Sequence, residues 1–197
     1  MANQNGGTYG FTGLFPIMPG EAASLRNYLR TLDDSRDYPR GSPLSEVPIV
    51  HMARLVVIDR LAYQGIPAKV DTLKSAYLLF ACDFDGFSID VLISRMIKHI
   101  PREFETIWKH CRGFPDRGGH DDIAAYFERC QATTNLLLAD QPDASVNDIL
   151  RGLMYRRKLT DFVRQVQATQ PDPKTLKENF EKMWQCLQNS VPRAGEM

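Results

Sequence analysis

The feature that most constrains the fold is an apolar, β-branched run at residues 48–59, PIVHMARLVVID. Branching at Cβ favours the pleated surface of a sheet, so we expect a strand from about Ile49 to Ile58. Both faces of this strand are mostly apolar, which is typical of a strand covered on both sides. The alternation of side chains places His51 and Arg54 on opposite faces unless a β-bulge intervenes.

Three further runs predict strands. The first is Thr8–Ile17, rich in Thr, Tyr and Phe, and it ends at two prolines. The second is Leu73–Phe84, which follows the central run closely and predicts an antiparallel pair with it. The third is the short apolar segment Thr133–Ala139. Together with the central run they give four expected strands.

Helical spacing of apolar residues fills most of the remaining chain. We expect helices at 22–32, from Phe87 onward, after Pro101 and around Ile123, followed by two C-terminal helices that begin after Ser145 and at Pro173. The order βαββαβ predicts an α+β fold, a ferredoxin-like antiparallel sheet with helices on one face. We expect a single domain over residues 1–197, with a core at 8–140 and C-terminal helices at 144–190.

Composition excludes several classes of function. Lys plus Arg and Asp plus Glu are 24 each, so no net charge attracts nucleic acid or an anionic membrane. We interpret the basic cluster Arg151–Arg164 as a solvated helix face. The four cysteines lack C-x-x-C spacing, and His110, Cys111 and His120 fit no zinc pattern, so no metal site is expected. With no leader and no apolar run of membrane length, a cytoplasmic protein is expected.

Three short motifs carry a resemblance: HMARLVVID at 51–59, DFDG at 83–86 and CRGFP at 111–115. With the order of elements, they resemble the dimeric α+β barrel superfamily, which includes dye-decolorising peroxidases, chlorite dismutases and cofactor-free monooxygenases, and most of all its uncharacterised bacterial members. The resemblance implies a homodimer. Dye-decolorising peroxidases carry a Gly-x-x-Asp-Gly motif, and Cys82 stands here in place of its first glycine. Haem is therefore a candidate cofactor that the resemblance alone does not supply.

The candidate site residues are His51, Arg54 and Asp85. His51 could ligate haem, act as a general base or border a pocket; the alternative is a core histidine bonded to backbone or to a carboxylate. Arg54 needs an anion, supplied either by a ligand or by Asp59, Asp83 or Asp85. Asp85 could be an acid–base group, or a cap for the helix that follows it.

The leading hypothesis is a small cytosolic protein that binds a hydrophobic small molecule on the face of its sheet, with oxidoreductase chemistry of peroxidase or monooxygenase type as one option. In that hypothesis His51 contacts the ligand, Arg54 holds an anionic group and Asp85 orders the edge of the pocket. The alternative is a non-catalytic protein that dimerises through this face or partners an oxidative enzyme. In that case all three residues are structural.

Overall fold

The structure, a computed structural model, describes residues 3–33, 42–61, 63, 65–67 and 73–192. The chain divides into two compact units, Met1–Val146 and Asn147–Met197. We describe each unit by itself.

The first unit is built on an antiparallel sheet. Its strands are β1 (Gln4–Asn5), β2 (Thr8–Pro16), β3 (Val50–Ile58) and β4 (Tyr77–Asp85), in the spatial order β1-β2-β4-β3. Strands β2, β3 and β4 lie close to the ranges expected from the sequence, and β3 pairs antiparallel with β4 as expected. The α+β class is therefore confirmed.

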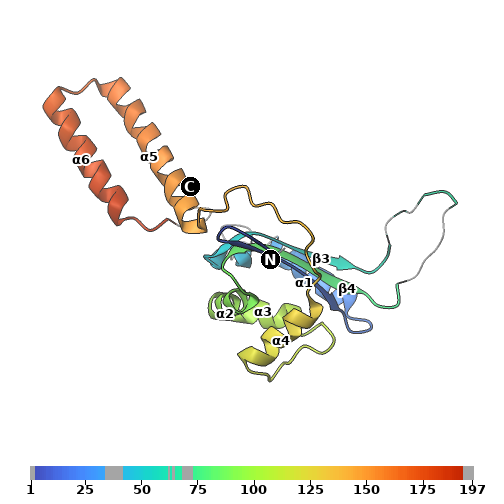
Figure 1. The fold of residues 1–197 in the computed structure, drawn as a ribbon. Coiled ribbons are helices and arrows are strands. Elements are labelled where there is room, and N and C mark those ends of the chain that lie inside the picture. Colours follow the sequence, from blue (N-terminus) through green and yellow to red (C-terminus); the bar gives the residue numbers. More distant parts are fainter. Residues whose placement is uncertain (1–2, 34–41, 62, 64, 68–72, 193–197) are drawn as a thin grey trace. The chain divides into compact units, whose positions relative to one another are not determined.

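The helices of this unit gather on one face of the sheet. They are α1 (Ala22–Asp33), α2 (Ile89–His99), α3 (Pro101–Trp108) and α4 (His120–Cys130), with a 3₁₀ turn, η1, at Pro43–Glu46. Figure 1 shows α2, α3 and α4 stacked beneath the sheet. Pro101 occupies the first turn of α3, as its missing amide donor favours.

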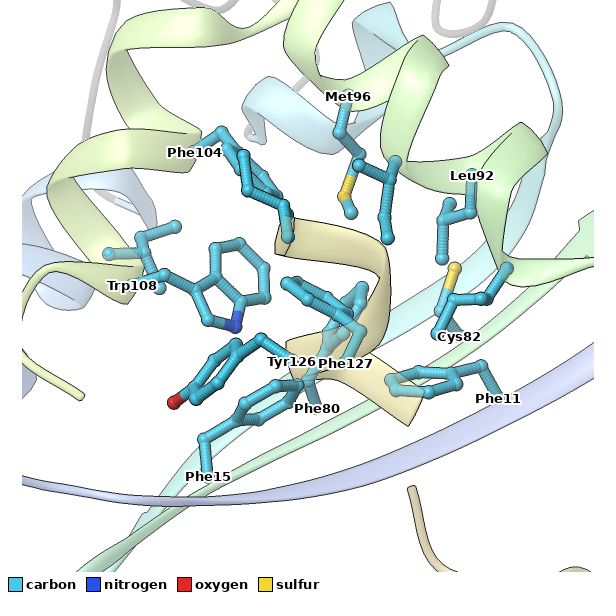
Figure 2. Packing of buried hydrophobic residues seen from close by; sticks show 14 of the residues in the cluster. Phe11, Phe15, Phe80, Cys82, Leu92, Met96, Phe104, Trp108, Tyr126 and Phe127 are labelled. Atoms are coloured by element: carbon cyan, nitrogen blue, oxygen red, sulfur yellow. The ribbon is translucent and has the colours of Figure 1, made fainter. Parts of the chain in front are cut away.

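A cluster of aromatic side chains fills the space between sheet and helices. Figure 2 shows Phe127 of α4 at its centre, with rings from the strands on one side and from α3 on the other. The Phe127 ring centroid lies 4.9 Å from that of Phe15 and 5.1 Å from that of Trp108. Trp108 is fully buried, and its plane stands at 83° to the ring of Phe15 and at 81° to the ring of Phe80. These edge-to-face contacts stabilise the cluster beyond the area that it buries.

The expected strand at 133–139 is wrong. This segment belongs to no strand, and the residue that forms an isolated bridge to the sheet, Gln131 with Gly13, lies just before it. The physical reason lies at the edge of β2, where β1 already pairs with Thr8 and Tyr9. With that part of the edge occupied, the 133–139 segment leaves it.

The second unit is a helical hairpin of α5 (Val146–Thr169) and α6 (Pro173–Asn189), as expected from the sequence. Asp172 caps α6, because its carboxylate accepts the amides of Lys174 and Thr175. Among residues 147–192, Leu187 is the only hydrophobic side chain that is fully buried. None of the described helices is long and apolar enough to cross a membrane.

Candidate functional site on the exposed face of the sheet

The face of the sheet opposite the helices carries a mixed set of side chains. Cross-strand register fixes its members, because residues opposite one another point the same way. Gly10 opposes Asp83, which opposes Met52, while Thr12 opposes Ala81, which opposes Arg54. In the single chain this side of the central strand is open, and Met52 is 66% exposed.

A groove of about 430 Å³ lies on this face. Its floor is made by small residues on the two central strands of the sheet, Gly10, Thr12 and Ala81. One wall is formed by Met52 and Arg54 of β3, and the other by the loop segment 134–137. The volume lies within the range of small-molecule pockets, about 300–1,000 Å³.

Leu137 of the loop wall packs directly against Gly10. A Cβ atom at that position would lie 2.8 Å from a methyl group of Leu137, so only glycine lets Leu137 approach so closely. Two hydrogen bonds hold the same loop, from the Asn5 side chain to the Leu137 carbonyl and from the Gly7 amide to the Pro142 carbonyl. The segment expected to be a fourth strand is thus the outer wall of the groove.

Arg54 stands on this face without an acidic partner. Its side chain is exposed, and no described carboxylate lies within the 4.0 Å that defines an ion pair. Two of the acids that the sequence offered are paired elsewhere, Asp59 with Arg26 at 2.6 Å and Asp85 with His51 at 2.7 Å. The favoured structural ion pair for Arg54 is therefore not formed, and the guanidinium can accept an external anion.

Asp83 is the acidic group of the groove. Its carboxylate is half-buried, and no described donor lies within hydrogen-bond distance of it. Burial raises the pKa of the Asp83 carboxyl above its usual value, and the nearby His51 opposes part of that rise. The groove contains one cation and one carboxyl group, and neither has a side-chain hydrogen bond or an ion pair with a described residue.

A β-bulge brings His51 to this face. The register between β3 and β4 shifts between Val50 and Met52, so His51 is the extra residue. Its Nε2 atom lies 2.7 Å from Asp85 Oδ1, and the other oxygen of Asp85 accepts the amide of Val146 at 2.9 Å. The bulge that would bring His51 and Arg54 to one face is present, and Asp85 is a structural link rather than the cap of α2, whose N-cap position is Ser88.

These contacts do not suit haem. The Nε2 atom of His51 is the nitrogen bonded to Asp85, and His51 is not among the residues that line the groove. The bond to Asp85 leaves the Nδ1 atom of His51, but no histidine is among the residues that line the groove, so none is placed there as an axial ligand. We therefore derive no chemistry through haem.

The other donors considered in the sequence are also engaged. His110 Nδ1 lies 2.8 Å from Glu21 Oε2, and His120 Nε2 lies 2.8 Å from Ser94 Oγ. Within the described part of the chain, no group of three His, Cys, Asp or Glu side chains could hold a metal ion. Burial raises the pKa of the Cys82 thiol, which keeps it protonated and unreactive.

A second hollow, of about 480 Å³, lies on the helix side of β3 between α1 and η1. Its lining is mostly apolar and includes Leu44, Leu55 and Ile107. Arg26 at its rim is already paired with Asp59, which lowers the pKa of that carboxyl. The exposed face of the sheet offers the unpaired charges and is the stronger candidate site.

Sequence reasoning nominated Arg54, which the structure places on this face, and treated Asp83 only as its internal partner. It missed Gly10, Thr12 and Leu137. The sequence held a signal for two of these residues. In β2, aromatic residues alternate with the small residues Gly10 and Thr12, which therefore share one face of the strand.

No model of a known protein family, no curated protein and no solved structure matches this chain.

Proposed function

We propose that this protein binds a small amphiphilic molecule in the groove on the exposed face of its sheet. The apolar part of the ligand lies over Gly10 and Ala81, between Met52 and the loop wall, and its anionic group binds Arg54. The observation that carries the proposal is an exposed guanidinium, without a described acidic partner, at the edge of a largely apolar hollow. A guanidinium is suited to this role because its planar donors match a carboxylate.

Anilinonaphthalene sulfonate, an apolar fluorophore with one anionic group, is a suitable first probe. We expect its fluorescence to rise on binding the native protein. Ala81→Leu fills the floor of the groove and should abolish most of the rise, while Arg54→Gln should weaken binding about tenfold, the effect of losing a charge-assisted hydrogen bond. Arg95→Gln, at an exposed position of α2, is the matched control and should bind as the parent protein does.

Circular dichroism and thermal melting must show that all variants are folded, since the same dye binds loosened proteins. Equal fluorescence in the native protein and in Ala81→Leu would contradict the proposal.

A protein partner on the same face is a second candidate. Three apolar side chains beside the groove are strongly exposed: Met52 at 66%, Leu136 at 88% and Leu138 at 85%. An apolar surface of this kind favours burial by another chain, either a second copy in a homodimer or an accessory partner. Sedimentation of the native protein and of Leu136→Glu checks this, because loss of a dimer in the variant alone would favour the partner over the small molecule.

The relation to ferredoxin-like proteins and to the dimeric α+β barrel superfamily is part of this proposal. The adjacent order of β2, β4 and β3 supports it, because a ferredoxin-like sheet has its first, third and second strands in that order. The place beside β2, where a ferredoxin-like sheet has its fourth strand, is occupied here by β1 and by the loop wall. Oxidative chemistry receives no support from the groove, and the proposal is limited to binding.

A further inference from the structure

Two unpaired groups of opposite charge line the same groove. Arg54 lies on β3 and Asp83 on β4, and both belong to the exposed face of the sheet. Arg54 opposes Ala81 and Asp83 opposes Met52, so the two charged residues are diagonal neighbours. Diagonal residues on adjacent strands have Cα atoms about 7–8 Å apart, farther than directly opposite ones.

The two groups do not pair with each other. No ion pair within 4.0 Å joins them, although the long Arg54 side chain is free of other described acids. Arg54 remains exposed, while Asp83 is half-buried beside the floor, with one carboxyl oxygen 3.3 Å from where a Cβ of Gly10 would stand. A molecule in the groove can therefore lie between them and contact both.

Neighbouring groups do not satisfy Asp83. His51 opposes part of the rise in the pKa of the Asp83 carboxyl, but its Nε2 atom is bonded to Asp85. A half-buried carboxylate without a donor is unfavourable, and an ammonium group of a ligand would correct this by both charge and hydrogen bonding. A ligand with an anion alone would satisfy Arg54 and bring a second negative group near Asp83.

We propose that the ligand of the groove is a small apolar zwitterion, such as a hydrophobic dipeptide, with its carboxylate on Arg54 and its ammonium group on Asp83. The inference rests on the proposed function of the same groove and narrows its ligand class. The apolar side chains of such a ligand lie against Met52 and Leu137. A dipeptide suits the diagonal spacing of the two residues better than a single charged group does.

Calorimetric titration of the native protein with leucyl-leucine and with decanoate tests the ligand class. Decanoate is apolar and carries only a carboxylate. We expect leucyl-leucine to bind more tightly than decanoate. Asp83→Asn should weaken leucyl-leucine about tenfold or more and leave decanoate unchanged or slightly tighter, whereas Arg54→Gln should weaken both ligands. Glu105→Gln, an exposed acid on α3, is the matched control and should change neither affinity.

These titrations distinguish failure of the zwitterionic ligand from failure of the groove as a binding site. Binding of decanoate but not of leucyl-leucine, or an equal effect of Asp83→Asn on both, would overturn the zwitterion and leave the anion-binding groove intact. No binding of either ligand would overturn both.

The free protein supplies a second measurement. A double-mutant cycle of Arg54→Gln and Asp83→Asn should show no coupling in thermal stability, since the two groups are unpaired without ligand. Clear coupling would identify a structural ion pair and overturn the inference.

Discussion

Asp83 makes the folded protein sensitive to pH in a direction that can be worked out. Burial raises the pKa of its carboxyl in the folded state above the ordinary value of 3.8. The stability that protonated Asp83 contributes is therefore fully present below pH 3.8, and it is lost as the pH rises through the pKa of the folded state. Ionisation of the half-buried Asp83 therefore opposes folding as the pH rises.

Asp83→Asn should accordingly stabilise the protein at pH 7 and leave its stability almost unchanged near pH 3, because the amide keeps the shape of the protonated acid. Thermal melting of both proteins across this pH range is the measurement. Glu105→Gln should show no such gain. A lower melting temperature for Asp83→Asn at pH 7 would mean that the carboxylate has a stabilising partner in the fold.

At the same scale, the sequence predicted which residues deserved attention but not how they would be paired. The β-branched run identified His51 and Arg54, and the alternation rule made their common face depend on a bulge. Residue spacing does not specify where a bulge forms, because that depends on the strand opposite. For the same reason, the sequence could not show that Asp85 pairs with His51, or that Arg54 pairs with none of the described acids.

At the scale of elements, α4 is the helix on which the aromatic core depends. Phe127 is fully buried and has ring contacts with Phe11, Phe15, Phe104, Tyr126 and Trp108. Phe127→Ala should destabilise the protein by about 3–5 kcal/mol, measured by denaturant unfolding. Phe87→Ala, at a position that is 72% exposed, should change stability by less than about 0.5 kcal/mol. Similar effects of the two substitutions would contradict the packing described for Figure 2.

Helices were predicted well because their apolar periodicity and their end signals, such as Asp172 before Pro173, are local. The strand expected at 133–139 was wrong for a reason that is not local. An apolar run forms a strand only where a sheet edge is free, and β1 occupies the edge of β2 at Thr8 and Tyr9. A two-residue strand such as β1 gives too short a pattern to be recognised in the sequence.

At the scale of the whole molecule, the two units differ sharply in how much apolar surface they bury. Almost all of the fully buried hydrophobic side chains belong to residues 1–146, and an isolated pair of helices gains little stability on its own. Removal of residues 149–197 should therefore lower the melting temperature of the first unit by less than about 5 °C. Loss of cooperative unfolding in the shortened protein would show that the hairpin is required for the fold.

The central claim is that the exposed face of the sheet, between Arg54 and the loop wall, is where this protein binds its ligand. The most direct test is the map of backbone amide shifts in nuclear magnetic resonance spectra during titration of the full chain with leucyl-leucine. The account predicts saturable shifts centred on Gly10, Thr12, Ala81 and Asp83. Shifts centred instead on Leu44 and Leu55, on the helix side of β3, or on residues 147–192 would contradict it.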